Sequence, residues 1–264
     1  MAYFTGTVYS KCLLQDTSFH VILPQDGRRY IWDTPPKTLI LLHGLSDSAA
    51  TWVRRTAIER YAERYNLAVV IPEVQRSYYH DMVNGIKAFT YITQEVPELA
   101  EKMFHLSTRK EDLLIAGLSM GGYGALRCAL EAPERFGYCG AFSGCYDLAD
   151  LYRMAVDPNG DAVLEGLESD YRAVFGEKSE IPENASYEHF IKAAAGRKDL
   201  PKIYMMCGTD DFLYGHTCRA RQLCAENGIE VDYEEWPGYH EWDMWDEAIE
   251  RMLKKFLGPG RKDY

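Results

Sequence analysis

The sequence predicts an α/β fold in which helices cover both faces of a mostly parallel central sheet. Three observations support this fold class. Short, continuous apolar runs recur along the chain, as in strands that are buried on both faces of a sheet. Amphipathic helical patterns alternate with these runs. The length of 264 residues suits a single domain over residues 1–264, with about three quarters of the unfolded surface removed from water.

The first predicted elements are an antiparallel hairpin and a buried strand. Residues 3–14 and 19–23 alternate apolar and polar side chains around a turn at 15–18, which is typical of a hairpin with one solvated face. Residues 38–43 form a continuous apolar run and predict a strand inside the parallel sheet. The polar residues 46–48 are expected to cap the helix that follows.

Five further strands follow, and helical patterns separate most of them. The strands are predicted at residues 67–72, 113–116, 138–142, 203–207 and 230–236. A long helix is predicted from about residue 82 to 105, with a kink near Pro97. The last helix is predicted at about 241–257, where a glycine and a proline end it.

The segment at about 148–198 breaks this alternation, because it contains helical pieces but no apolar run. We expect it to form a lid-like cap over the carboxyl ends of the strands, where open α/β sheets bind ligands. Within it, residues 157–168 follow most of the pattern of a calcium-binding loop. Ala162 stands where that loop needs a glycine, so a polar lid loop is the expected structure there.

Composition and charge exclude several kinds of partner. Forty acidic and 29 basic residues give a formal net charge of −11, which disfavours nucleic acid. We find no secretory signal and no stretch long enough to cross a bilayer, so we expect a cytoplasmic protein that binds no membrane. The seven cysteines lack the spacing of a disulfide framework or a zinc site, and we expect no metal and no cofactor. The oligomeric state stays open, a homo-oligomer included.

The motif Gly117-Leu118-Ser119-Met120-Gly121 points to chemistry. It follows a predicted buried strand and leads directly into a helical pattern. In this context the glycines let the backbone turn sharply around an exposed serine. Ser119 is therefore the predicted nucleophile.

A nucleophilic serine needs a base to take its proton and a carboxylate to orient that base. In α/β-hydrolases the chain order is serine, acid, histidine. Asp210 and Asp211 follow the strand predicted at 203–207, and His240 follows the next strand. His240 is the predicted base, whereas the spacing leaves open which aspartate is the acid, since either could instead cap the turn.

The oxyanion of the reaction needs hydrogen-bond donors. We expect the backbone N–H groups of Met120, directly after the nucleophile, and of Leu45, in the loop after the first buried strand, to supply them. Aromatic side chains are expected to line the substrate pocket. The candidates are Tyr79 and Trp242, which lie near predicted loop ends, together with Trp52 and Tyr78.

These motifs resemble those of the putative-esterase family of α/β-hydrolases, which includes esterase D, S-formylglutathione hydrolases, tributyrin esterases, and acetyl-xylan and feruloyl esterases. The likeness extends from about residue 3 to 256 and is carried by His43-Gly44-Leu45 with Trp52, and by the stretches 117–125, 207–214 and 237–242. The resemblance implies metal-independent hydrolysis through an acyl-enzyme. It also implies Asp211 as the acid, because the family's acid directly precedes a Phe-Leu pair.

We therefore expect a serine carboxylesterase whose partner is a small-molecule ester with a short-chain acyl, acetyl or feruloyl group. Two alternatives keep the fold: a thioesterase of the S-formylglutathione hydrolase type and an acyltransferase. A catalytically silent binding module is the alternative from a different class.

Overall fold

The computed structural model describes residues 1–24, 32–156, 166–176 and 181–261. Its centre is an eight-stranded sheet in the order β1-β2-β4-β3-β5-β6-β7-β8. The strands β1 and β2 pair antiparallel to each other, β2 pairs antiparallel to β4, and all later pairs are parallel. The strands are β1 (Ala2–Ser10), β2 (Gln15–Leu23), β3 (Lys37–Leu42), β4 (Leu67–Pro72), β5 (Leu113–Leu118), β6 (Tyr138–Phe142), β7 (Lys202–Gly208) and β8 (Val231–Trp236). The predicted α/β fold is confirmed.

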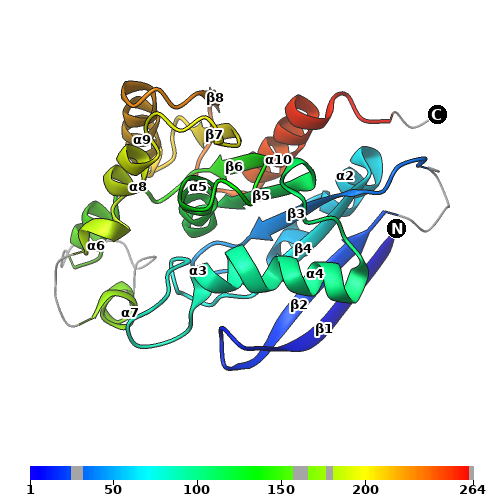
Figure 1. The fold of residues 1–264 in the computed structure, drawn as a ribbon. Coiled ribbons are helices and arrows are strands. Elements are labelled where there is room, and N and C mark those ends of the chain that lie inside the picture. Colours follow the sequence, from blue (N-terminus) through cyan, green and yellow to red (C-terminus); the bar gives the residue numbers. More distant parts are fainter. Residues whose placement is uncertain (25–31, 157–165, 177–180, 262–264) are drawn as a thin grey trace.

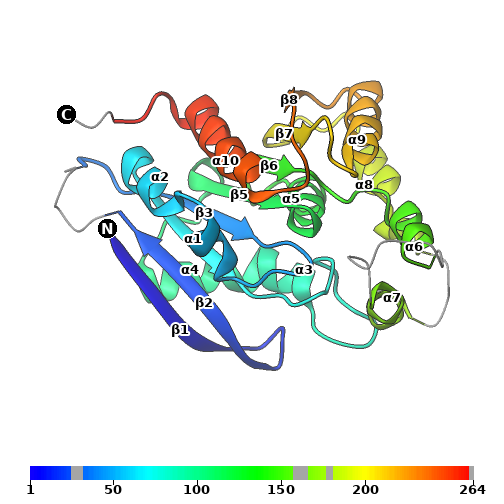
Figure 2. The ribbon, with the colours of Figure 1, turned by 180° about the vertical axis from the view of Figure 1, so that it is seen from behind.

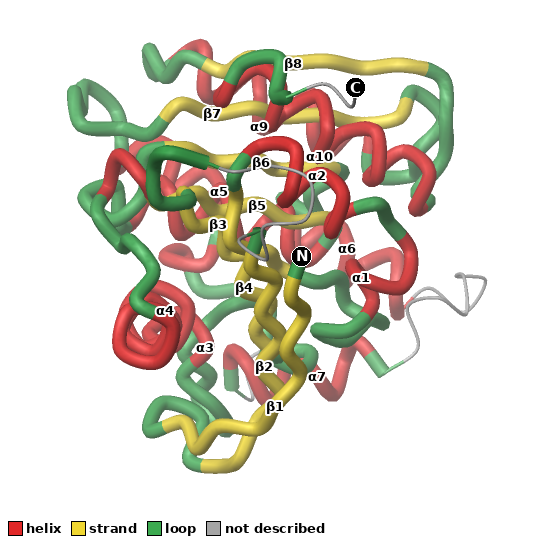
Figure 3. The backbone as a smooth tube through the Cα atoms, turned by 90° about the vertical axis from the view of Figure 1, so that its right-hand side faces the viewer, coloured by secondary structure: helices red, strands yellow, loops and turns green. Residues whose placement is uncertain are grey.

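Helices cover both faces of this sheet (Figures 1 and 2). The helices α1 (Thr51–Arg55), α2 (Ile58–Tyr65) and α10 (Trp242–Leu257) bury apolar side chains against one face. The other face is covered by α3 (Ala88–Thr90), α4 (Val96–Phe104), α5 (Met120–Glu131), α8 (Tyr187–Ala193) and α9 (Tyr214–Glu226). Figure 3 looks along the sheet and shows α4 on one side and α2 and α10 on the other. No described helix is both long and apolar enough to cross a membrane.

The hairpin turn lies at residues 11–14, so the prediction of a turn at 15–18 is wrong. The reason is a contact from a distant part of the chain. The Glu95 carboxylate accepts hydrogen bonds from the Ser10 hydroxyl at 2.6 Å and from the N–H groups of Lys11 and Cys12 at 2.7 and 2.9 Å. These bonds hold the backbone donors of the turn, and residues 15–18 are free to pair in β2.

Two helix predictions also need correction. The long helix begins at Ala88 and not near residue 82, because the preceding backbone donates hydrogen bonds elsewhere: the Val83 N–H to Val174 O and the Asn84 N–H to Ala173 O. It then passes through a π-helical turn, Tyr91–Glu95, before α4. The helix α1 has Ala50 at its N-cap without a side-chain hydrogen bond. The polar residues 46–48 therefore do not cap it.

The segment 148–198 contains α6 (Leu148–Val156), α7 (Leu167–Phe175) and α8, and its described residues include no strand. An ion pair of 2.7 Å joins Asp170 of α7 to Arg76, in the loop after β4. This pair connects α7 to a loop at the carboxyl ends of the strands. Residues 157–165, which hold most of the calcium-loop pattern, lie outside the described residues.

Candidate active site

Ser119 occupies the sharp turn between β5 and α5. Its backbone has φ 53° and ψ −117°, a conformation that a non-glycine residue adopts only when its surroundings enforce it. A Cβ atom on Gly117 would lie 2.5 Å from the Gly121 carbonyl oxygen, and one on Gly121 would lie 2.6 Å from the Leu42 carbonyl oxygen. The two glycines therefore allow the strand, the turn and the helix to approach closely enough to project the serine from the sheet edge.

Two backbone N–H groups are available beside Ser119. The N–H of Met120 opens α5, and that of Leu45 lies in the loop after β3; neither donates to any acceptor among the described residues. The loop that contains Leu45 begins at His43. The Tyr79 hydroxyl donates a hydrogen bond to the His43 carbonyl oxygen at 2.9 Å and so fixes the start of this loop. Both residues, Leu45 and Met120, therefore present an unused backbone donor to the same pocket, that of Met120 at the N-terminal end of α5.

His240 is held by Asp211. The ring Nδ1 lies 2.9 and 3.0 Å from the two carboxylate oxygens, and Asp211 is only 4% exposed, whereas Asp210 is exposed. Burial disfavours the charged form of Asp211. Its hydrogen bond and charge interaction with His240, together with the Leu213 N–H, outweigh burial and hold the carboxyl pKa below its ordinary value. Asp211 therefore stays ionised and keeps the His240 ring oriented.

The His240 ring is also fixed by aromatic packing. Phe212 and Trp245 lie against it, with ring centroids at 4.7 and 4.8 Å. The Trp245 indole in turn donates to the buried Ser143 hydroxyl at 3.1 Å. No hydrogen bond joins the Ser119 hydroxyl to His240 among the described residues, and such contacts are often looser without substrate.

A pocket of about 250 Å³ brings these groups together. Ser119, His240, Leu45 and Met120 all line it, and so do two of the predicted aromatic residues, Tyr78 and Trp242.

Trp52 and Tyr79 do not line this pocket. Both are fully buried. The Trp52 indole donates to the Leu42 carbonyl oxygen, and its ring packs edge-on against Trp242 at 5.3 Å. Trp52 thus packs behind Trp242, which does line the pocket, and Tyr79 holds the start of the loop that leads to Leu45.

The sequence interpretation missed several lining residues: Asp47, Cys145, Leu151, Phe212 and Trp245. Trp245 lies one helical turn after Trp242, and Phe212 directly follows Asp211, so these two have a local signal. Asp47 belongs to the polar stretch that the sequence assigns to a helix cap. Leu151 comes from the cap helix α6, and no local pattern could place it here.

Comparison with known proteins identifies the family. Residues 10–256 match the model of the putative esterase family. The chain belongs to this family. An acetyl esterase of Caldicellulosiruptor saccharolyticus is 33% identical over 257 residues, which cover 94% of this chain and 96% of the relative. The protein is therefore a carboxylic-ester hydrolase, and the resemblance inferred from the motifs is confirmed.

Two solved structures from Staphylococcus aureus are similar to this esterase over nearly their full length. The fluorophosphonate-binding serine hydrolase FphF is 32% identical with a TM-score of 0.84, and the match covers 97% of this chain and 98% of that one. The S-formylglutathione hydrolase FrmB is 31% identical with a TM-score of 0.82 and the same coverage. Both resemblances agree with an α/β-hydrolase fold.

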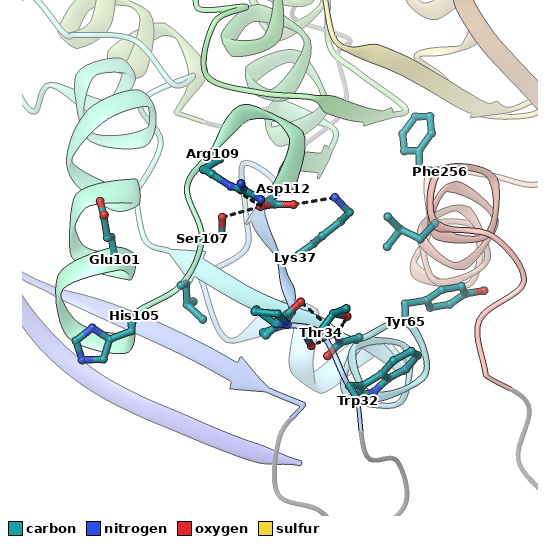
Figure 4. A pocket seen from close by; sticks show the side chains of 15 residues that line it. Trp32, Thr34, Lys37, Tyr65, Glu101, His105, Ser107, Arg109, Asp112 and Phe256 are labelled. Atoms are coloured by element: carbon teal, nitrogen blue, oxygen red, sulfur yellow. Dashed lines mark hydrogen bonds and ion pairs between the residues drawn. The ribbon is translucent and has the colours of Figure 1, made fainter.

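The esterase has a larger cavity of about 940 Å³ at the opposite edge of the sheet, where Lys37 and Asp112 mark the amino ends of β3 and β5 (Figure 4). Its charges neutralise one another, since Asp112 pairs with Lys37 at 3.0 Å and with Arg109 at 2.6 Å. Figure 4 shows His105 apart from Ser107, whose hydroxyl donates to Asp112. The described residues that line this cavity include no serine and histidine arranged for catalysis, and the smaller pocket is the candidate active site.

The described residues contain no group of three or more histidine, cysteine, aspartate or glutamate side chains arranged to hold a metal ion. The polar groups in and around the smaller pocket include the Ser119 hydroxyl, the His240 ring, the carboxylates of Asp47 and Asp211, and the N–H groups of Leu45 and Met120.

Proposed function

We propose that this protein is a serine carboxylesterase that hydrolyses small acyl esters through an acyl-enzyme. The observation that carries the proposal is that Ser119 and His240 line one pocket, and Asp211 forms a hydrogen bond with Nδ1 of the His240 ring. Ser119 Oγ attacks the ester carbonyl, and His240 Nε2 takes the serine proton. The oxyanion is stabilised by the N–H groups of Leu45 and Met120. The tetrahedral intermediate then collapses, and His240 gives the proton to the leaving alcohol.

The second half of the reaction uses the same groups. His240 removes a proton from water, the resulting hydroxide attacks the acyl carbonyl, and Ser119 leaves with the proton returned by His240. Asp211 remains charged throughout and stabilises the imidazolium that forms in each half.

The pocket supports a short acyl group. Its volume is about 250 Å³, and buried apolar side chains line it, including Tyr78, Cys145 and Leu151. The acetyl esterase relative agrees with this size. We expect the rate with p-nitrophenyl esters to be highest for acetate and to fall toward octanoate.

The test of the mechanism is Ser119→Ala. We expect turnover of p-nitrophenyl acetate to fall by about 10⁴-fold or more, with unchanged circular dichroism, and labelling by a fluorophosphonate to disappear. The matched control is Ser48→Ala, because Ser48 is an exposed serine on the neighbouring loop. This variant should keep both the turnover and the fluorophosphonate labelling of wild type. Retained turnover or labelling in Ser119→Ala would refute the serine mechanism.

A further inference from the structure

Asp47 places a carboxylate inside the candidate active site. Its own N–H donates to the Gly44 carbonyl oxygen at 3.3 Å, which closes a tight turn after β3. The side chain folds back over that turn, so that a Cβ atom on Gly44 would lie 2.7 Å from Asp47 Oδ2. Gly44 directly precedes Leu45, whose N–H is one of the two available oxyanion donors. The carboxylate therefore lies in the same turn as a proposed oxyanion donor and lines the pocket that also holds Ser119.

No lysine or arginine among the described lining residues offsets this carboxylate. Among the described residues that line the pocket, Asp47 is the only carboxylate and none is a lysine or an arginine. Asp47 forms no ion pair with any described residue. Burial raises the pKa of its carboxyl, and the charge of His43, the Gly44 backbone and the charges of His240 and Arg55 oppose that rise. The described pocket lining is therefore mostly apolar and includes one acidic side chain with no lysine or arginine beside it.

We propose that Asp47 makes this esterase selective for uncharged esters and excludes esters that carry a carboxylate near the scissile bond; the inference rests on the proposed function. Two negative charges in a narrow, apolar pocket repel strongly, because little water lies between them to screen the interaction. A neutral leaving alcohol that carries hydroxyl groups avoids this repulsion and can donate a hydrogen bond to Asp47.

Asp47 distinguishes two classes of substrate that the same catalytic groups can hydrolyse. A glutathione thioester carries two carboxylates and would bring both toward a pocket with no basic side chain among its described lining residues. An acetylated sugar carries none. The selectivity expected from Asp47 thus favours the acetyl ester over the glutathione thioester.

The test uses two acetyl esters that differ mainly in charge: methyl 4-acetoxybenzoate, which is neutral, and 4-acetoxybenzoate, which is an anion. We measure kcat/KM for both at about pH 8, where a carboxyl is ionised, and divide each by the rate of alkaline hydrolysis of the same ester. We expect wild type to prefer the neutral ester by about 10- to 100-fold. In Asp47→Asn the preference should fall by at least about tenfold.

Asp210→Asn is the matched control, since it makes the same change of charge at an exposed carboxylate near the same loops that does not line the pocket. Its preference should remain that of wild type. If Asp47→Asn still hydrolyses both esters and prefers the neutral one as strongly as wild type does, the inference is overturned. Failure of the proposed function gives a different result, namely that neither ester is hydrolysed in a Ser119-dependent reaction.

A second measurement needs no variant and decides the question if Asp47→Asn fails to fold. An acetyl ester that carries a quaternary ammonium group, 4-acetoxyphenyltrimethylammonium, reverses the sign of the charge on the substrate. After division by the rate of alkaline hydrolysis, wild type should prefer this cation to the anionic ester at least as strongly as it prefers the neutral ester. A cationic ester that is disfavoured as strongly as the anion overturns the electrostatic explanation.

Discussion

Asp211 and His240 show how one side-chain contact sets up the proposed chemistry. Both Asp211 oxygens lie within 3.0 Å of Nδ1, which places the ring proton on Nδ1 and leaves Nε2 to accept a proton from Ser119. The Leu213 N–H donates to the same carboxylate at 2.8 Å. Buried and bonded on two sides, Asp211 can neither rotate away nor be replaced by its exposed neighbour Asp210.

We predict that Asp211→Asn lowers kcat by about 10³- to 10⁴-fold. The amide nitrogen can donate to Nδ1 and favours the wrong tautomer of His240, while the shape of the side chain is kept. Steady-state kinetics with p-nitrophenyl acetate measure the effect. Asp210→Asn is the control and should stay within about twofold of wild type. Equal losses in the two variants would refute the assignment of Asp211.

At the scale of the element, the turn from β5 into α5 depends on space that only glycine leaves. Gly121 packs against the end of β3, where an added Cβ atom would lie 2.6 Å from Leu42 O and 2.7 Å from His43 O. Both neighbours are backbone atoms in a buried strand and loop, so neither can move aside cheaply. The same loop continues into Leu45, which couples the helix position to the second oxyanion donor.

We predict that Gly121→Ala destabilises the protein by about 2 kcal/mol or more and lowers Tm by ~5 °C. The added methyl group forces α5 away from β3 and moves the Met120 N–H, so kcat should fall as well. Calorimetry and ester kinetics provide the two readouts. Gly6→Ala in β1 is the control, because a Cβ there meets no atom within 4 Å. A Gly121→Ala protein as stable and active as Gly6→Ala would contradict the close packing described above.

At the scale of the whole molecule, the proposed catalytic groups converge because of the sheet. Parallel strands end at the same edge, so the loops after β3, β5, β7 and β8 bring Leu45, Ser119, Asp211 and His240 together. Glu73 links two loops of this edge. It accepts from the Ala49 N–H at 2.9 Å and lies 3.1 Å from His43 Nε2. Burial opposes its ionisation, but its bonds to His43, Ala49 and Gln75 lower the pKa to about 2.

We predict that this carboxylate contributes to acid unfolding. The folded pKa of Glu73 lies below its unfolded value of 4.5, so its contribution of roughly 3 kcal/mol is present above pH 4.5 and is lost as the pH falls toward about 2. Urea unfolding at a series of pH values from about 7 to 3 measures it. In Glu73→Gln the free energy of unfolding should fall less over this window than in wild type. Parallel curves for the two proteins would refute the prediction.

Local patterns in the sequence determined the fold class, the order of the strands along the chain and the glycine-rich turn at Ser119. Apolar runs and helical periodicity depend on near neighbours, and a rule for parallel sheets then places the loops after the strands at one edge. The same rule led to His240 and to the aspartate pair as candidates.

Only the tertiary structure decided what depends on contacts between distant segments. It showed that Asp211 and not Asp210 touches His240, that Glu95 shapes a hairpin turn more than eighty residues away, and that Trp52 and Tyr79 lie behind the pocket. It also placed Asp47, an expected helix-capping residue, in the lining of the candidate active-site pocket. The direction of a side chain follows from how the whole chain packs, and no local pattern records it.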